Sequence, residues 1–177
     1  DIRMKLLITG ASSTLGKNLT SELLKIDELS IRLLEHHSPL QNENCEVFKC
    51  DIQDVGNLAH ACSEIDTVIH LAALTHSPTG KEYFEVNETG TDNLLTACRK
   101  NSVRRFIFIS SAAASEEGGE YGVSKLRCEE MVRESHLNWV ILRPSEVYGP
   151  NMQEGIGKLI TWIKKFPIIP VIGDGSY

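Results

Sequence analysis

The feature that most constrains this chain is a glycine turn between a short apolar run and a helix pattern. The run from Met4 to Thr9 (MKLLIT) has the length and composition of a buried parallel strand, and it ends at Gly10. Residues 15–26 then carry apolar side chains at helical spacing. This order predicts a strand, a tight turn and a helix, which is the first unit of a parallel sheet.

The same alternation continues along the chain. Further strands are predicted at 31–34, 47–49, 67–71, 106–109 and 139–142. Further helices are predicted at 55–62, with Asp54 as the N-cap, at 83–100 and at 121–135. Right-handed crossovers then give an α/β fold with a Rossmann-type doubly wound parallel sheet, whose ligand crevice lies at the carboxyl ends of the strands.

The length of the chain suits one domain. Its 177 residues, 41% of them hydrophobic, suffice for a single well-packed core. After Arg143-Pro144 the sequence is rich in glycine and proline, with one helix pattern at 158–166. We therefore predict one domain at 4–150, followed by a region at 151–177 that is too short for a domain of its own.

Composition argues against several classes of partner. The net charge of -6 and the lack of a Lys/Arg cluster argue against nucleic acid. The apolar stretches are shorter than the ~18 residues that cross a bilayer, and the start of the chain shows no signal-peptide pattern, so we predict a cytoplasmic protein with no membrane contact. The five cysteines contain no C-x-x-C pair and the histidines lack metal-like spacing. We expect reduced thiols and no metal.

The segment from Thr9 to Gly16 (TGASSTLG) suits a pyrophosphate, because N–H groups at the start of a helix hold anions. A P-loop is a competing interpretation, since Gly16-Lys17 resembles its end. Five residues instead of four separate the glycines, however, and Asn18 replaces the Ser or Thr that would bind Mg²⁺. A turn that merely joins a strand to a helix is the other alternative.

Two carboxylates follow the second and third predicted strands. Glu35, 19 residues after Gly16, can accept hydrogen bonds from the adenosine ribose and repel the 2′-phosphate of NADP, which favours NAD, although it could simply be solvated. Asp51 can reach the adenine amino group or cap a helix. Gly90 costs ~1 kcal/mol inside a helix, so close packing against the sheet or the cofactor is expected there.

A Tyr-x-x-x-Lys pair supplies candidate catalytic chemistry. Tyr121 and Lys125 lie four residues apart and share one helix face. An ammonium and the nicotinamide cation of NAD⁺ would lower the pKa of the phenol, so that Tyr121 could take a proton from a substrate hydroxyl. Lys125 could also hold the nicotinamide ribose, and Ser111 could bind the substrate oxygen. A serine hydrolase is disfavoured because the chain has no G-x-S-x-G elbow.

These motifs, in this order, resemble the extended short-chain dehydrogenase/reductases, and among them the NAD-dependent epimerase/dehydratase family that acts on nucleotide sugars. The resemblance runs from about residue 5 to 177 and rests on Thr9-Gly10 to Gly16, Asp51-Ile52, His70-Leu71-Ala72-Ala73, Asn87 with Gly90 to Leu94, Ser110-Ser111, Tyr121 to Lys125, and Leu142-Arg143-Pro144 to Gly149-Pro150. It implies an enzyme whose catalytic residues are Ser111, Tyr121 and Lys125.

NAD is the implied cofactor, and residues 4–150 are the implied NAD-binding domain. We expect cofactor contacts from Gly10, Ser12, Ser13, Thr14, Leu15, Gly16, Glu35, Asp51, Ile52, Leu71, Ala72, Ala73, Asn87, Lys125 and Pro144. Residues 171–176 resemble the segment just before the family's closing substrate domain. We therefore expect 151–177 to be the start of an incomplete substrate-binding region.

Three departures from the family pattern affect the expected site. Ser13 holds the middle place of G-x-x-G-x-x-G, so the backbone is expected to approach the pyrophosphate less closely. Glu146 stands where relatives carry an Asn that helps to hold the substrate, and a carboxylate there would repel a nucleotide diphosphate. Only nine residues separate Ser111 from Tyr121, which indicates a trimmed pocket rim.

We predict a nucleotide-sugar epimerase that oxidises a sugar hydroxyl transiently, with NAD accepting and returning the hydride. Dehydratases of the family carry Asp-Glu after the catalytic Ser or Thr, whereas Ala112-Ala113 stand here, which disfavours dehydration. Two alternatives are an NAD(P)H-dependent ketone or aldehyde reductase and a non-catalytic dinucleotide-sensing module, the latter suggested by Ser13, Glu146 and the incomplete substrate region. By analogy with the family, we expect a homodimer formed by the helices at 83–100 and 121–135.

Overall fold

The computed structural model describes residues 3–145, 147–149 and 156–166. The chain divides into two compact units, 1–145 and 146–177, so the division falls five residues before the predicted end of the first domain. The described element of the second unit is helix α6 (Ile156–Lys165). Within the described ranges, no helix has both the length and the apolar composition needed to cross a membrane.

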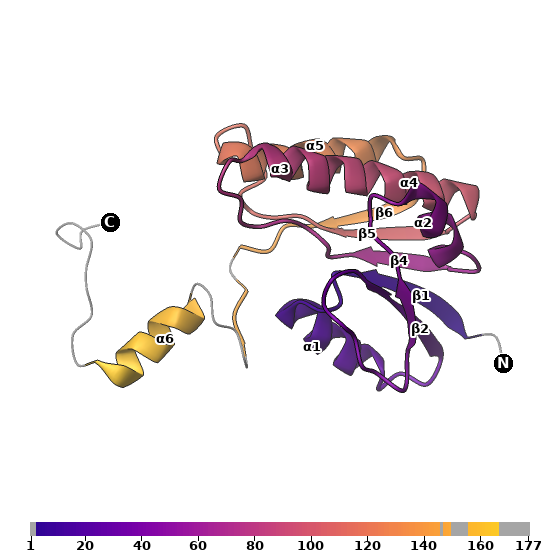
Figure 1. The fold of residues 1–177 in the computed structure, drawn as a ribbon, viewed down its shortest axis with the longest axis horizontal. Coiled ribbons are helices and arrows are strands. Elements are labelled where there is room, and N and C mark those ends of the chain that lie inside the picture. The colour runs from indigo at the N-terminus through magenta and orange to yellow at the C-terminus, as the bar shows by residue number, and fades with distance from the viewer. Residues whose placement is uncertain (1–2, 146, 150–155, 167–177) are drawn as a thin grey trace. The chain divides into compact units, whose positions relative to one another are not determined.

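Six parallel strands form the sheet of the first unit (Figure 1). They are β1 (Met4–Thr9), β2 (Leu29–Glu35), β3 (Glu46–Lys49), β4 (Thr67–His70), β5 (Arg105–Ile109) and β6 (Asn138–Leu142). Their order is β3-β2-β1-β4-β5-β6, and every neighbouring pair is parallel. The strand order reverses between β1 and β4, which opens a crevice at their carboxyl ends. The predicted Rossmann-type doubly wound sheet is confirmed.

Helices pack on both faces of this sheet, because alternate residues of a strand point to opposite sides. The helices of the first unit are α1 (Thr14–Leu23), α2 (Val55–Ala61), α3 (Lys81–Tyr83), α4 (Gly90–Lys100) and α5 (Gly119–Glu134). Leu7 packs in one core cluster with Leu58 of α2 and Leu94 of α4. Ile8 packs on the other face with Leu19 of α1. Burying a leucine of this kind stabilises the fold by roughly 1.5 to 3 kcal/mol.

One predicted helix differs in detail from the structure. The range 83–100 was expected as a single regular helix, but it contains the end of α3, a π-helical stretch at Phe84–Thr89 and then α4. The wider turn places the Asn87 side chain inside the protein, where only 3% of the residue is exposed. Stretches of π-helix often occur at functional sites. The spacing of apolar residues does not reveal a π-helical stretch, because one wider turn changes that spacing little.

Candidate functional site

The glycine turn brings the ends of β1 and β4 together. Gly10 has φ +70°, and a Cβ atom at this position would lie 2.6 Å from the backbone nitrogen of Ala72. The Ala72 N–H donates to the Thr9 hydroxyl at 3.2 Å, next to the turn. Only glycine combines this backbone conformation with such a close approach. The turn therefore sits at the reversal point of the sheet.

Ser13 takes the middle position of the turn without backbone strain, since its φ is -66°. Its hydroxyl accepts from the Gly16 N–H at 3.0 Å and donates to the Gly10 carbonyl at 2.8 Å. Ser13 is thus the N-cap of α1. The hydroxyl therefore occupies the N–H group of Gly16. Thr14 and Leu15 are the first residues of the helix, where backbone N–H groups have no acceptor within the helix.

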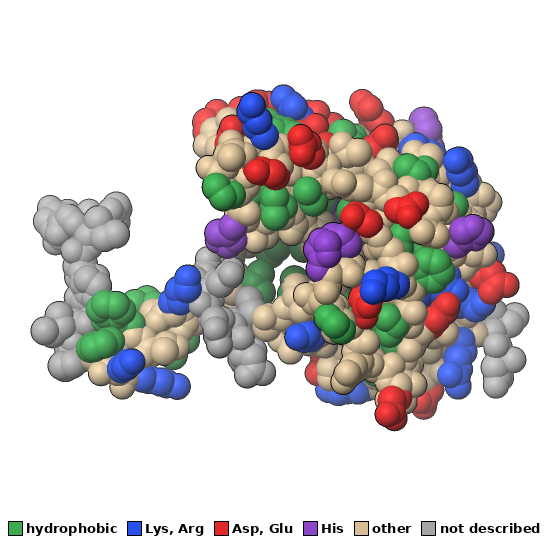
Figure 2. All heavy atoms as spheres, in the orientation of Figure 1, with side chains coloured by type: hydrophobic (Ala, Val, Ile, Leu, Met, Phe, Trp, Pro, Cys, Tyr) green, Lys and Arg blue, Asp and Glu red, His purple; other side chains and the backbone are tan. Residues whose placement is uncertain are grey.

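A hollow of about 590 Å³ opens beside this turn. In Figure 2 the face of the molecule is hollowed beside histidine side chains. Its lining includes these residues expected to contact the cofactor: Gly10, Ser12, Ser13, Asp51, Ile52, Leu71, Ala72 and Ala73. It also includes residues that were not predicted: Leu34, His36, His37, Cys50, Gln53, Leu74 and Val86. The size lies within the usual range for ligand sites.

The end of β2 presents histidines to the hollow instead of Glu35. The Glu35 carboxylate accepts from the Leu40 N–H at 2.6 Å, and Glu35 is not among the lining residues. His36 Nε2 lies 2.9 Å from Asp51 Oδ2, and the His37 ring is 3.5 Å from the His36 ring, centroid to centroid. Both histidines directly follow a strand at its carboxyl end. Their place in the sequence, directly after a strand, is the signal by which they could have been identified as site residues.

Asn87 holds the segment that leaves β4. Its Oδ1 accepts from the Leu74 N–H at 2.7 Å, and its Nδ2 donates to the Leu74 carbonyl at 3.2 Å. The same Nδ2 donates to the Ser124 hydroxyl of α5 at 3.1 Å. Asn87 therefore acts on the wall of the hollow through Leu74, and it connects that wall to the helix that carries Tyr121 and Lys125.

The structure brings Ser111 and Tyr121 together at the end of β5. A Cβ atom on Gly122 would lie 2.1 Å from the Ala113 carbonyl oxygen, so glycine at this position allows α5 to approach the turn after Ser111. Burial raises the pKa of the Tyr121 phenol, and a hydrogen bond with Ser111 lowers it to a smaller extent. The Tyr121 ring also meets the edge of Tyr83 at 5.7 Å between centroids.

Lys125 is buried on the same face of α5, with 2% of the residue exposed. Its Nζ donates to the Ile109 carbonyl at 2.8 Å and lies 4.2 Å from the centre of the Phe108 ring. Desolvation lowers the pKa of Lys125 to about 8. The ammonium form therefore prevails below about that pH, close to the end of β5 and to Tyr121, one helical turn earlier.

The remaining expected contacts lie at the rim or outside the described residues. The Pro144 carbonyl accepts from the Ala112 N–H at 2.9 Å, which ties the end of β6 to the turn after Ser111. Gly90 packs against Ile52, since a Cβ atom there would lie 2.8 Å from Ile52 Cγ2. Glu146 and residues 171–176 lie outside the described residues. Within the described ranges, no group of three His, Cys, Asp or Glu side chains could hold a metal ion.

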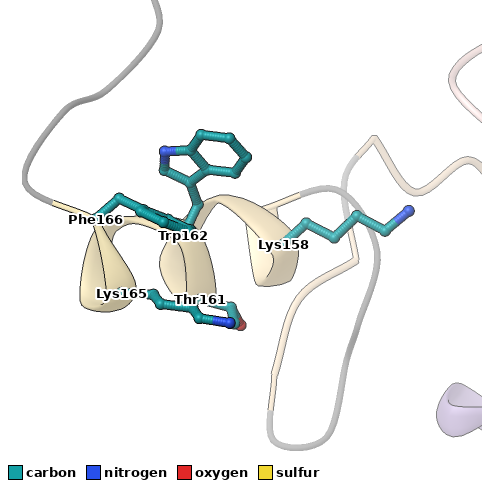
Figure 3. Close-up of a pocket in the computed structure, with 5 residues that line it drawn as sticks. All are labelled: Lys158, Thr161, Trp162, Lys165 and Phe166. Atoms are coloured by element: carbon teal, nitrogen blue, oxygen red, sulfur yellow. The ribbon is translucent and has the colours of Figure 1, made fainter.

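A second hollow, of about 530 Å³, lies on helix α6 (Figure 3). Its lining residues all come from one helix and the residue that follows it: Lys158, Thr161, Trp162, Lys165 and Phe166. The Trp162 and Phe166 rings lie 5.0 Å apart. A surface formed by one helix encloses no ligand, so this hollow is a poor candidate for chemistry.

Comparisons with known proteins identify a matching family and several relatives of this chain. The model of the NAD dependent epimerase/dehydratase family matches residues 6–176. UDP-glucose 4-epimerase of Vibrio cholerae is 27% identical over 186 residues, which cover 90% of this chain and 57% of the relative. Ceramide reductase of Caulobacter vibrioides is 30% identical over 181 residues, which cover 99% of this chain and 56% of the relative.

Among solved structures, UDP-glucuronic acid 4-epimerase from Bacillus cereus in complex with NAD superposes with a TM-score of 0.81 at 26% identity. The match covers 92% of this chain and 63% of that one. The chain spans little more than half the length of these two curated relatives.

Proposed function

The chain belongs to the NAD dependent epimerase/dehydratase family, and from that premise we propose that the complete protein is an NAD-dependent nucleotide-sugar epimerase. The observation that carries the proposal is the placement of Tyr121 and Lys125 on one face of α5, beside Ser111. Support comes from the Vibrio cholerae and Bacillus cereus relatives, whose names state epimerisation of UDP-linked sugars.

The residues of the hollow fit NAD, the family's cofactor. The helix N-terminus at Thr14 and Leu15 and the open surface at Gly10 suit a pyrophosphate. His36 and Asp51 lie where the adenosine would be read, at the ends of β2 and β3. NAD, when bound, supplies the acceptor and then the donor of the hydride. Leu71 to Ala73 would line its path toward Lys125.

The chain's own residues move the proton. The half-buried Tyr121 phenol keeps its proton at neutral pH, and its partial burial raises the pKa further above the ordinary value. A cation nearby would lower that pKa, and our candidate is Lys125, one helical turn away, which is an ammonium below about pH 8. Tyr121 would then accept the proton of a sugar hydroxyl whose oxygen is held by Ser111, and it would return the same proton when the other epimer forms.

The test is turnover of a panel of UDP-linked sugars by the full-length protein and by Tyr121→Phe. We expect the variant to lose roughly 10²- to 10⁴-fold in turnover, while NAD affinity stays within a few-fold. Tyr83→Phe is the matched control, because it removes the hydroxyl of the neighbouring ring and leaves the proton acceptor in place. Unchanged turnover in Tyr121→Phe would refute the proposal.

Reduction of a ketone is a second candidate, favoured by the Caulobacter vibrioides relative, which aligns with 99% of this chain. The two activities differ in their balance of reducing equivalents. An epimerase leaves the amount of NADH unchanged and returns deuterium to the sugar carbon that carried it. A reductase consumes one NADH for each product formed. NAD binding without turnover of either kind would instead indicate a dinucleotide-sensing module.

A further inference from the structure

The buried histidine at the end of β4 has a role that neither the family match nor the proposed proton transfer assigns. His70 is 1% exposed, and its ring lies near those of Phe106 and Phe108 on the neighbouring strand β5, with centroids 5.9 and 5.6 Å away. Both of its ring nitrogens have partners. Nδ1 lies 2.7 Å from the Thr9 hydroxyl, and Nε2 lies 3.1 Å from the Thr91 hydroxyl of α4.

The partners of these hydroxyls determine where the His70 proton sits. The Thr9 oxygen accepts from the Ala72 N–H, so its own hydrogen is free to be donated to Nδ1. The Thr91 hydroxyl donates to Cys128 Sγ at 3.5 Å, so it accepts from the ring at Nε2. With this direction, the Thr9 hydroxyl, the His70 Nε2–H, the Thr91 hydroxyl and the Cys128 thiol each donate to an acceptor within the network. The ring is therefore neutral and protonated at Nε2.

The hydrogen-bonded chain runs between two points that hold the wall of the hollow. At one end is the Ala72 N–H, in the wall itself. At the other end the Cys128 thiol donates to the Asn87 carbonyl at 3.3 Å. The Asn87 side chain binds both backbone groups of Leu74. The segment from Leu71 to Leu74 is thus held at both ends by one buried network.

The Lys125 ammonium favours a neutral His70 ring. Desolvation and the nearby Lys125 ammonium together lower the His70 pKa to about 3, and among the described residues Lys125 is the charged group that acts on the ring. The carboxylate that acts on Lys125 is that of Glu129 on the same helix, whereas Cys128 is a neutral thiol because burial raises its pKa. A protonated His70 would place a second cation beside Lys125 in a buried site. A neutral ring leaves the Lys125 ammonium as the cation there.

We propose that His70 is a positioning residue, which ties the cofactor-facing segment Leu71–Leu74 to the helices carrying Asn87 and Lys125 through a neutral ring protonated at Nε2. The inference rests on the proposed use of the hollow for NAD. When the network is broken, the segment loses its anchor at Ala72, and NAD binding must then order it. The expected signature is weaker binding in a protein that still folds.

The ring itself can be observed in the full-length protein. Nitrogen-15 NMR should show one imidazole that is protonated at Nε2 and does not change between about pH 5 and 8, whereas exposed histidines titrate in that range. A ring that titrates there, or that carries its proton on Nδ1, would overturn the inference. This measurement does not depend on the cofactor.

Calorimetric titration with NAD tests the positioning role. His70→Phe keeps a ring beside Phe106 and Phe108 but loses both hydrogen bonds, so we expect NAD affinity to fall about tenfold, which corresponds to about 1.4 kcal/mol. Thr91→Val removes one of the two His70 bonds together with the bond to Cys128, and it should weaken binding several-fold. It also serves as the second variant, should His70→Phe fail to fold.

Ser135→Ala is the matched control, because the Ser135 hydroxyl is also buried but bonds Val132 and Leu137 at the turn between α5 and β6, away from the hollow. It should lose stability with no change in NAD affinity. If the His70 and Thr91 variants behave in the same way as this control, the role is merely structural and the inference is wrong. If the wild type does not bind NAD, the proposed function fails, and the positioning role fails with it.

Discussion

Helix α5 carries two buried charges one turn apart, and they differ in what surrounds them. Lys125 has one backbone carbonyl and one aromatic ring as partners, and desolvation lowers its pKa to about 8. Glu129 is fully buried as well, yet its carboxylate accepts two bonds from Arg143 at 2.7 Å and one from Arg133 at 2.6 Å. Burial raises the pKa of Glu129, but these bonds together lower it to about 2.

The difference separates the charge that we propose for the chemistry, at Lys125, from the one at Glu129 that serves the fold. The Glu129 carboxylate is matched by guanidinium groups, so it is ionised at any neutral pH and ties α5 to the end of β6 through Arg143. The Lys125 ammonium is matched only in part, so its charge weakens the fold and responds to pH. A catalytic cation close to Tyr121 needs this incomplete compensation, since a paired lysine would have less effect on the phenol.

The largest effect is expected from Lys125→Met. Turnover should fall by roughly 10²-fold or more, because the phenol loses its neighbouring cation. The free energy of unfolding should rise by about 1 to 3 kcal/mol, because methionine fills the site without a buried charge. Turnover is measured with the substrate that proves active, and stability by urea unfolding.

The gain in stability should depend on pH in a definite direction. Because folding lowers the Lys125 pKa from 10.5 to about 8, the cost of burying the ammonium is full below about pH 8 and disappears as the pH approaches 10.5. The advantage of Lys125→Met should shrink over that window. Lys100→Met, at an exposed position of α4, is the control. A variant that is less stable than wild type at pH 7 would contradict the comparison.

Glu129→Gln should have the opposite balance of effects. Removing the carboxylate charge leaves Arg143 and Arg133 without their anion, and breaking a buried pair of this kind costs about 3 to 5 kcal/mol. NAD affinity of the folded protein should stay unchanged, because no atom of Glu129 lines the hollow. Urea unfolding and calorimetric titration measure the two quantities.

The free energy of unfolding at acid pH tests the same carboxylate in the wild type and in Glu129→Gln. Folding lowers the Glu129 pKa from 4.5 to about 2, so its contribution to stability is present above pH 4.5 and is lost as the pH falls toward 2. The variant should lack this part of the acid dependence. Glu130→Gln makes the same change at the next residue, which is exposed, and should retain it. Equal acid dependence in the wild type and Glu129→Gln would show that the carboxylate is not held as described.

The same contrast explains what the sequence could and could not predict. Apolar periodicity and the glycine turn predicted the sheet, because strands and helices follow from local patterns. The spacing of Tyr121 and Lys125 predicted a shared face, because the helix repeat is fixed. The partners of a charge are not local: Arg143 follows Glu129 by 14 residues and reaches it only through the fold. No sequence spacing indicates that His70 connects Thr9 to Thr91.

The smallest effect is expected from Glu35→Gln, which tests whether Glu35 determines the preference for NAD over NADP. Its carboxylate resembles that of Glu129 in being held, here by the Leu40 N–H, whereas His36 and Asp51 line the hollow. Glu35→Gln keeps an oxygen for Leu40, so we expect the ratio of NAD to NADP affinities to change by less than about threefold, or under about 0.7 kcal/mol. Asp51→Asn is the comparison variant, because it alters a carboxylate that does line the hollow. A shift toward NADP of tenfold or more in Glu35→Gln would mean that Glu35 turns to read the ribose when the cofactor binds.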